Sequence, residues 1–388
     1  MNSGILLLPK INKITVLGSG IMGHGIAQIS AMNAYDVTLR DVEEKFLDNA
    51  MNKIRWSLDK LVEKNKIDKQ QSDKIYGKIK PVVDLREALI DTDLLIEAVP
   101  EDLNLKKKVY SEVDQFSQEK TIYSSNTSTL PISEISQLSS RPDKFIGLHF
   151  FNPPQLMKLV EVIPGARTDK SIVDLGINFV KSLGKDPVLC NKDVPGFIVN
   201  RIFIPLVHEA AYCLESDGKS MTQIDSSVKF KMFLPMGIFE LADYTGLDVI
   251  HKATVEMYSR DKTVVNPHPK IEHLFSSGKY GKKSGEGFYS YGDKNYERIP
   301  LSEEEAKQYD PIRILSVAIN NAAWLISNNV CTKEDVELAL KLGMGIKKEL
   351  FEIGKEFGFE KIINTLNYLK ERNGSFYAPD PYLKSISK

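Results

Sequence analysis

The sequence predicts an α/β fold, a doubly wound sheet followed by an all-α region that is present in two copies. Between residues 13 and 163, short apolar runs alternate with amphipathic helical patterns, which is typical of parallel strands joined by right-handed helical crossovers. From about residue 195 the strand-like runs end, and residues 201–214 align without gaps with residues 313–326, at an offset of 112. We therefore expect three domains, at residues 1–192, 193–300 and 301–388.

Composition and charge limit the classes of protein to which the chain can belong. It has 388 residues, 42% hydrophobic and 27% charged, and its 51 basic and 52 acidic residues give no field that favours nucleic acid or membrane. The N-terminal MNSGILLLPKINK has too short an apolar run for a signal-peptide core, and no segment reaches the roughly 20 apolar residues of a membrane span. Cys190, Cys213 and Cys331 are scattered without metal-ligand spacing, so we expect a cytoplasmic location and no metal.

The first predicted strand, residues 13–17, leads into a glycine-rich turn. Gly18, Gly20 and Gly23 have the G-x-G-x-x-G spacing between a strand and a helix. The first glycine permits the tight turn, the second lets a pyrophosphate approach the backbone, and the third allows close helix–strand packing. The N-terminus of the helix offers N–H groups to the phosphates. The unit predicts a Rossmann-type dinucleotide site, and its turn includes Ile21 and Met22.

Two further positions in this unit carry predictions. We expect the helix to end near Asn33, a residue that tolerates the left-handed cap conformation. Asp41 follows the second predicted strand, DVTLR, 23 residues after Gly18, where an acid hydrogen-bonds the ribose hydroxyls. Its charge would repel a 2′-phosphate, so Asp41 favours NAD over NADP. Arg40 leaves the alternative open, because a basic side chain that turned inward would serve that phosphate.

Two polar segments near the predicted sheet each allow a structural and a ligand-binding interpretation. Residues 43–80 form a lysine-rich helical pattern that is either a solvated face or a surface for an anionic ligand. The loop SNTSTLP follows the predicted strand TIYSS, and its hydroxyls and amide are good helix caps. Loops at the carboxyl ends of parallel strands also bind ligands, so Asn126 and Ser128 are candidates for contacting a substrate or a nicotinamide.

Two predicted strands, KFIGLHFF and MKLVEVI, are joined by the turn Asn152-Pro153-Pro154. Period-two alternation places His149 in one apolar row and Glu161 in another, where unpaired polar groups are costly. Strands lying side by side would pair the two side chains. An imidazole oriented by a carboxylate is a common general base, and a structural hydrogen bond is the alternative that these two residues alone favour.

The helical region contains one candidate functional residue. Asn200 interrupts the apolar run of residues 197–207, and a buried asparagine there needs a backbone or ligand partner. The second copy has Ile312 at this place, so it lacks any chemistry of Asn200. We also expect Met236-Gly237 of the first copy to correspond to Met344-Gly345 of the second.

Together, these features resemble the 3-hydroxyacyl-CoA dehydrogenase family, which includes 3-hydroxybutyryl-CoA dehydrogenases. The resemblance covers nearly the whole chain, and its strongest parts are SNTST (125–129), GLHFFNPPQLMKLVEVI (147–163), KDVPGFIVNRIFIPLVHEA (192–210), PMGIFELADYTGLD (235–248) and GKKSGEGFYSY (281–291). It implies NAD-dependent oxidation of (S)-3-hydroxyacyl-CoA to 3-oxoacyl-CoA, or the reverse reduction of substrates such as acetoacetyl-CoA. Two rival hypotheses are a sugar-acid dehydrogenase on the same scaffold, such as one for L-gulonate, and a non-enzymatic NAD-binding protein.

The resemblance also implies roles for individual residues. His149 is the general base, Glu161 orients it, and Ser128 and Asn200 bind the substrate oxygen. The remaining positions are Glu101, Asn126 and Asn152 near the NAD, with Ser57 and Lys64 at the CoA moiety. The extra helical copy resembles the tail of multifunctional fatty-acid oxidation proteins. We expect it to replace the dimer partner of single-copy enzymes, giving a pseudo-dimer within one chain, with further self-association possible through another face.

Overall fold

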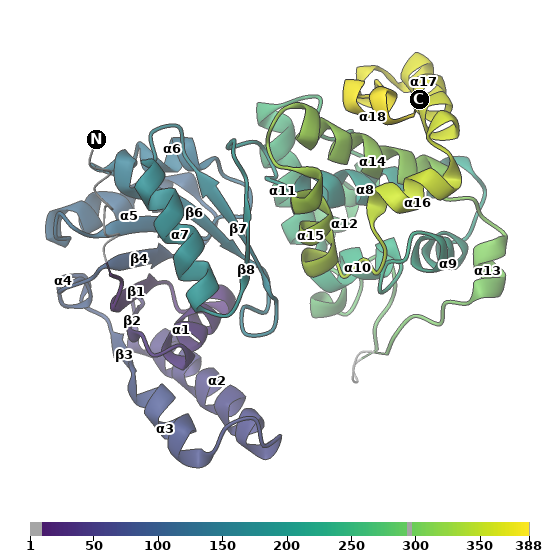
Figure 1. Ribbon diagram of the computed structural model, residues 1–388. Coiled ribbons are helices and arrows are strands. Elements are labelled where there is room, and N and C mark those ends of the chain that lie inside the picture. Colours follow the sequence, from purple (N-terminus) through teal and green to yellow (C-terminus); the bar gives the residue numbers. More distant parts are fainter. Residues whose placement is uncertain (1–9, 293–296, 388) are drawn as a thin grey trace. The chain divides into compact units, whose positions relative to one another are not determined.

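The computed structural model describes residues 10–292 and 297–387 (Figure 1). The chain divides into two compact units, with the boundary between Asp193 and Val194. The first unit contains the predicted doubly wound sheet, and the second is helical. The predicted fold class is confirmed. The boundary of a third domain near residue 300 stays a proposal that rests on the repeat.

The sheet of the first unit has the order β3-β2-β1-β4-β5-β6-β7-β8. Its strands are β1 (Lys13–Leu17), β2 (Asp36–Arg40), β3 (Ile79–Val82), β4 (Leu94–Glu97), β5 (Ile122–Ser125), β6 (Phe145–Phe150), β7 (Leu159–Pro164) and β8 (Asp186–Leu189). All neighbouring pairs are parallel except β6 and β7, which are antiparallel. The antiparallel pair is the one that carries His149 and Glu161.

Helices cover the sheet (Figure 1). They are α1 (Ile21–Met32), α2 (Glu44–Glu63), α3 (Lys69–Gly77), α4 (Leu85–Ala88), α5 (Leu103–Phe116), α6 (Ile132–Ser136), the short 3-10 helix η1 (Pro142–Lys144) and α7 (Lys170–Ser182). One continuous core joins α1, α2 and α7 to alternate strand residues such as Val16, Ile96 and Leu148. The residues between them face the other side of the sheet, where Gly147 lies against Ile132 of α6. His149, two residues beyond Gly147, therefore lies on the α6 side.

The helix after the glycine-rich turn ends at the predicted residue, but its C-cap differs from the left-handed cap that we expected. Asn33 is the C-cap of α1, with φ −99°, and its side chain donates to the carbonyl of Ile29 at 2.8 Å. The left-handed residue is the next one, Ala34, with φ 71°. The expectation of a left-handed Asn33 is therefore wrong, because its amide caps the helix directly and the chain reverses one residue later.

The second unit is built from helices in the part of the chain that the structure describes. They are α8 (Val199–Ser216), α9 (Met221–Lys231), α10 (Ile238–Thr245), α11 (Leu247–Arg260), α12 (Pro269–Ser276), η2 (Lys282–Ser284), α13 (Glu303–Lys307), α14 (Ile312–Ser327), α15 (Lys333–Gly343), α16 (Leu350–Phe357), α17 (Phe359–Asn373), η3 (Ser375–Tyr377) and α18 (Pro381–Ile386). None of the helices in residues 10–292 and 297–387 combines the length and apolar character that a membrane span needs.

The offset of 112, found in the sequence within α8 and α14, extends through the three helices that follow each of them. Helices α9, α10 and α11 begin at residues 221, 238 and 247, and α15, α16 and α17 begin at 333, 350 and 359. The N-caps Ser220 and Thr332 both form capping boxes. Gly246 and Gly358, which separate the last two helices of each copy, both have positive φ, 106° and 89°. The duplication is therefore structural as well as sequential.

The structure corrects one correspondence within the repeat. At the offset of 112, Met344 matches Met232, and the two are the C-caps of α15 and α9. Gly345 then matches Phe233, and both have positive φ, 72° and 59°. The expected pairing of Met236-Gly237 with Met344-Gly345 is wrong, because the two Met-Gly dipeptides lie at different positions of the two turns.

The first helices of the two copies pack against each other. Helix α14 contacts α8, and the expected apolar partners in them are buried: Ile202, Leu206, Ala211, Ile314, Ala318 and Ala323. A polar contact lies beside this apolar one. The guanidinium of Arg313 donates to Glu209, and the hydroxyl of Tyr377 donates to the same carboxylate at 2.8 Å. Burial raises the pKa of Glu209 although Arg313 opposes the shift.

Candidate active site

The glycine-rich turn has the shape that a dinucleotide requires. A Cβ on Gly18, with φ 88°, would lie 2.6 Å from the carbonyl oxygen of Ala98, and one on Gly23 would lie 1.7 Å from the carbonyl oxygen of Gly18. A Cβ on Gly20 would meet nothing within 4 Å. The turn is therefore closed on the strand side and open at Gly20, next to the first turn of α1, whose N–H groups have no partner within the helix. These residues fit a pyrophosphate.

Asp41 is fixed beside this turn. Its Oδ2 accepts hydrogen bonds from the N–H of Ser19 at 2.7 Å and from the Ser19 hydroxyl at 2.6 Å. Arg40, the neighbouring base, donates from Nε to the carbonyl of Val83 at 3.1 Å. The Arg40 side chain is thus held at the end of β3, while the Asp41 carboxylate lies at the turn. This arrangement favours the NAD reading of the sequence over the NADP alternative.

His149 and Glu161 are register partners across the antiparallel strands β6 and β7. The Nδ1 of His149 lies 2.6 Å from Oε2 of Glu161, so the pairing expected from the sequence is confirmed. The His149 residue is 6% exposed and Glu161 is fully buried. A buried carboxylate at hydrogen-bond distance fixes the ring orientation and favours the proton on Nδ1.

The loop after β5 carries Asn126 and Ser128 and runs beside β6. Ser125 is the register partner of Gly147, so the loop continues toward the level of His149. The Oδ1 of Asn126 accepts the backbone N–H of Phe150 at 2.9 Å. Asn126 is therefore bonded to the residue that follows His149, and the capping role considered for it is replaced by a link between loop and strand.

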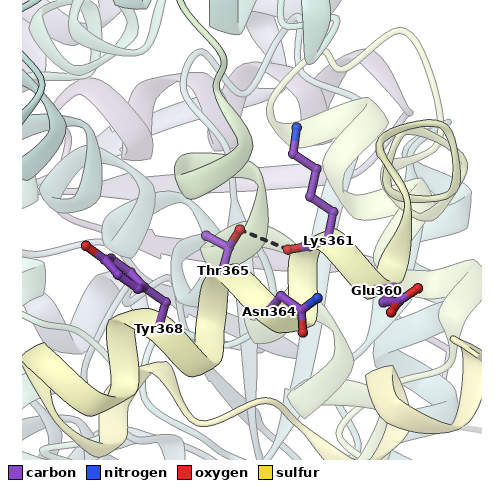
Figure 2. A pocket seen from close by; sticks show the side chains of 5 residues that line it. All are labelled: Glu360, Lys361, Asn364, Thr365 and Tyr368. Atoms are coloured by element: carbon purple, nitrogen blue, oxygen red, sulfur yellow. Dashed lines mark hydrogen bonds between the residues drawn. The ribbon is translucent and has the colours of Figure 1, made fainter.

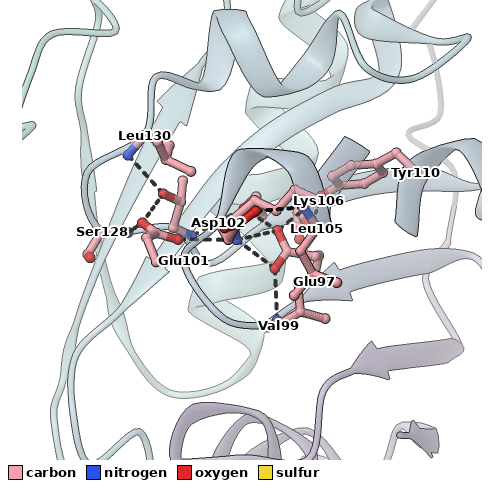
Figure 3. A network of polar contacts seen from close by, with 12 residues as sticks. Glu97, Val99, Glu101, Asp102, Leu105, Lys106, Tyr110, Ser128 and Leu130 are labelled. Atoms are coloured by element: carbon pink, nitrogen blue, oxygen red, sulfur yellow. Dashed lines mark hydrogen bonds and ion pairs between the residues drawn. The ribbon is translucent and has the colours of Figure 1, made fainter. Parts of the chain in front are cut away.

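Glu101 holds the same loop from the other side (Figure 3). Its Oε1 accepts from the Thr127 hydroxyl at 2.5 Å, from the N–H of Ser128 at 3.1 Å, and from the N–H and hydroxyl of Thr129 at 3.3 and 3.2 Å. Burial opposes ionisation of Glu101, but the ammonium of Lys106 and these hydrogen bonds outweigh it and lower the carboxyl pKa. Glu101, for which the resemblance implied only a place near the NAD, thus also anchors the loop that carries Ser128 through hydrogen bonds.

Beneath Glu101 lies a buried ion pair that the sequence did not predict. The Nζ of Lys106 lies 2.7 and 2.9 Å from the two oxygens of Glu97, and 3.2 Å from Oε2 of Glu101. Burial alone would lower the Lys106 pKa, but Glu97 and Glu101 outweigh it and raise the pKa. The sequence signal was the acid in the apolar strand DLLIEAV, which required a cationic or hydrogen-bonding partner.

The remaining candidates of the first unit lie in different settings. Asn152 is exposed in the turn after β6. Ser57 accepts from the amide of Gln28 at 2.9 Å, and the Gln28 carbonyl oxygen accepts from Gln155 at 3.1 Å, so Ser57 is joined to the loop that follows Asn152. Lys64 is the exposed C-cap of α2. The lysine-rich helical segment resolves into α2 and α3.

Lys185 was also missed by sequence reasoning. Its Nζ donates to the carbonyls of Pro154 and Met157 at 2.6 Å each, which fixes the loop between the two strands of the His–Glu pair. Burial lowers the pKa of Lys185 to about 8. A lysine in a Gly-Lys-Asp turn gives no sequence signal of such a contact.

Asn200 belongs to the second unit, as the second residue of α8, and is half-buried. Its proposed contact with the substrate oxygen therefore stays a prediction. The second unit also has a shallow hollow on α17, lined by Glu360, Lys361, Asn364, Thr365 and Tyr368 (Figure 2). These five side chains come from one face of one helix, and the Thr365 hydroxyl donates to the Lys361 carbonyl at 2.9 Å. The hollow contains none of the candidate residues.

The Rossmann-type sheet, the glycine-rich turn and the acid beside it define an NAD-dependent oxidoreductase, and the comparisons with known proteins agree. The model of the 3-hydroxyacyl-CoA dehydrogenase NAD-binding domain matches residues 13–194, and that of the C-terminal domain matches residues 196–291. The chain belongs to the 3-hydroxyacyl-CoA dehydrogenase family. The second match covers the first helical copy.

Individual relatives support the same assignment. The mitochondrial hydroxyacyl-coenzyme A dehydrogenase of Sus scrofa is 39% identical over 289 residues, 72% of this chain and 91% of the relative. The 3-hydroxybutyryl-CoA dehydrogenase of Clostridioides difficile is 39% identical over 72% of this chain and 99% of the relative. The structure of 3-hydroxybutyryl-CoA dehydrogenase from Escherichia coli covers 98% of both chains with a TM-score of 0.87 and 25% identity. That of (S)-3-hydroxybutyryl-CoA dehydrogenase from Ralstonia eutropha covers 73% of this chain and 100% of its own, with a TM-score of 0.70 and 33% identity.

Proposed function

We propose that the chain oxidises (S)-3-hydroxyacyl-CoA thioesters to 3-oxoacyl-CoA with NAD, or catalyses the reverse reduction, and that His149 is the general base. The observation that carries this assignment is the 2.6 Å hydrogen bond between Nδ1 of His149 and Glu161. A His–Glu hydrogen bond with only a structural role could lie on any pair of strands, with no candidate substrate-binding residue nearby. This one lies beside the Ser128 loop, in a chain whose relatives are named for hydroxyacyl-CoA oxidation.

Oxidation of a secondary alcohol removes a proton from oxygen while a hydride leaves the carbon, and bound NAD supplies the hydride acceptor. Because Nδ1 of His149 is engaged with Glu161, Nε2 is the ring nitrogen that takes the hydroxyl proton. Glu161 holds the ring in that tautomer and stabilises the imidazolium. In the reduction direction the same imidazolium returns the proton to the oxygen.

Neutral donors complete the proposed site. The hydroxyl of Ser128 and the amide of Asn200 would hydrogen-bond the reacting oxygen as partial negative charge changes on it. The residues assigned to the cofactor are Gly18, Gly20, Ile21, Met22, Gly23, Asp41, Glu101, Asn126 and Asn152, and those assigned to the CoA part of the substrate are Ser57 and Lys64.

The decisive experiment follows NADH absorbance during incubation with acetoacetyl-CoA. We expect NADH to be consumed by the wild-type protein and not by His149→Gln. Turnover of a free hydroxy acid such as L-gulonate, with none of CoA thioesters, would replace this proposal by the sugar-acid alternative. NADH binding without turnover of either class would leave a non-enzymatic NAD-binding protein.

The second helical copy is proposed to act as a built-in partner. The buried contact of α8 with α14, together with the Glu209–Arg313 ion pair, supports a pseudo-dimer of the two copies within one chain. In this proposal the copy is structural, because Ile312 stands where Asn200 stands in the first copy. Further self-association would use another face.

We also propose a cytoplasmic location, although some relatives are named as mitochondrial. The support is that Cys190, Cys213 and Cys331 are widely scattered in the sequence and buried, which suits a reducing compartment. Cell fractionation with an antibody to the full chain tests this, and recovery with an organelle fraction would overturn it.

A further inference from the structure

Glu97 is the centre of a polar cluster on the side of the sheet that carries His149. Registers pair Glu97 with Ser125 and Ser125 with Gly147, so the Glu97 side chain lies on the same sheet face as His149, two strands away. Its carboxylate is fully buried and accepts from Lys106, from the N–H of Val99 at 2.8 Å and from the hydroxyl of Ser125 at 2.7 Å. The acid is therefore fully engaged within the protein.

Lys106 connects the buried Glu97 to Glu101, which lies nearer the surface. The Lys106 side chain is 1% exposed, while the next two residues of the helix, Lys107 and Lys108, are exposed. The ammonium contacts both oxygens of Glu97 and then Oε2 of Glu101. Figure 3 shows Lys106 between the two acids. One cation therefore orders two carboxylates, one buried and one at the edge of the site.

The two carboxylate oxygens of Glu101 have different partners. Oε2 faces Lys106, and Oε1 receives the loop donors of Thr127, Ser128 and Thr129. The loop is tied to Glu97 as well, because the Ser125 hydroxyl that donates to Glu97 accepts the N–H of Thr127 at 3.2 Å. The position of the Ser128 backbone thus depends on both acids, and both acids depend on one lysine.

We propose that Lys106 is a positioning residue of the active site, which with Glu97 fixes Glu101 and through it the loop that carries Ser128. A buried ion pair adds little to stability compared with apolar side chains of the same volume. The contacts of Glu97 and Lys106 lead to the loop that carries Ser128, which indicates that the pair serves to fix the position of this loop. The inference deepens the proposed function, since its effect on turnover rests on the assigned role of Ser128.

The test uses the full chain and the paired variant Glu97→Gln/Lys106→Met, which removes both buried charges together. The first readout is amide hydrogen exchange of residues 126–130. We expect faster exchange in the paired variant than in the wild type, with the exchange of β6 unchanged. Unchanged exchange of the loop overturns the proposal, whatever Ser128 does. Lys108→Met, on the exposed face of the same helix, is the matched control and should leave both exchange and turnover unchanged.

The second readout is a double-mutant cycle with Ser128→Ala. We expect the paired variant to lower kcat about 100-fold, the usual effect of a misplacement of roughly 1 Å, with a smaller change of KM. Combined with Ser128→Ala it should lose little more than the larger single effect, because both act through one side chain. Effects that multiply independently overturn the positioning role. Full turnover of Ser128→Ala would instead overturn the proposed function of Ser128, and the exchange result would still decide the positioning.

If the paired variant does not fold, Glu101→Gln replaces it in both readouts. A glutamine has one accepting oxygen, so it can face either Lys106 or the loop donors with an acceptor, but not both. We expect the same faster loop exchange and the same non-additivity with Ser128→Ala, and wild-type exchange in Glu101→Gln would overturn the proposal.

Discussion

Glu161 faces His149 directly across two antiparallel strands, with 2.6 Å between Oε2 and Nδ1. Because both side chains are buried, the imidazole has little freedom to rotate away from the carboxylate. His149→Gln should lower turnover of acetoacetyl-CoA by about two to four orders of magnitude, the range for loss of a general base, with NADH affinity nearly unchanged. Glu161→Gln should also be slow, because the imidazolium loses its charged partner. Near-full turnover of His149→Gln would assign the proton transfer to another group.

Asp41 should set the preference for NADH over NADPH. Its carboxylate is held at the glycine turn by both donors of Ser19, while Arg40 is bonded to Val83. A 2′-phosphate at this place would meet a fixed negative charge. We expect Asp41→Ala to raise KM for NADH and to narrow the difference in kcat/KM between the two cofactors. Equal efficiency of the wild type with both, or an unchanged preference in Asp41→Ala, contradicts this reading.

Removing one member of the buried pair should cost far more stability than removing both. Lys106→Met leaves the Glu97 charge uncompensated in the interior, which should lower the free energy of unfolding by about 3–5 kcal/mol. Glu97→Gln/Lys106→Met should recover most of that loss, because the fully buried Glu97 charge is gone and only the partly exposed Glu101 carboxylate has lost its lysine. Urea unfolding followed by circular dichroism measures both. If the paired variant is as unstable as Lys106→Met, packing of the lysine stem rather than its charge is the cause.

Glu101 should contribute a measurable part of the acid sensitivity of the protein. Although burial opposes its ionisation, Lys106 and the loop donors lower its pKa in the folded state. The unfolded chain therefore binds the proton more tightly, and the stability that ionised Glu101 contributes is present above about pH 4.3 and lost as the pH falls through the lower folded value. The difference in unfolding free energy between wild type and Glu101→Gln should shrink as the pH falls below that point. A constant difference contradicts the prediction.

Deleting residues 305–388 should change the assembly state. The deletion uncovers the apolar face of α8, including Ile202 and Leu206, and leaves the Glu209 carboxylate without Arg313. We expect the truncated chain to dimerise or aggregate although every residue assigned to catalysis remains. Sedimentation velocity measures this, with the full chain as control. A truncated chain that stays monomeric and fully active would show that the second copy covers nothing.

The local units of this protein could be predicted from the amino-acid sequence alone. The strands, the glycine turn and the repeat follow from periodicity and spacing, which act over a few residues and are visible in the chain. The pairing of His149 with Glu161 was also predictable, because two short strands joined by a rigid turn have few ways to bury both polar groups. Membership in an NAD-dependent family follows from these local patterns together.

Which polar side chains meet across elements could be seen only in the folded structure. Lys106 stands in a run of three lysines that resembles a solvated face, yet it alone of the three is buried. Glu101 reaches the Ser128 loop 27 residues later, and Asp41 reaches Ser19 22 residues earlier. Periodicity tells which face of an element a residue occupies. Which residues meet there depends on how neighbouring strands and their connections are ordered in the sheet, and that order is fixed by the packing of the whole unit.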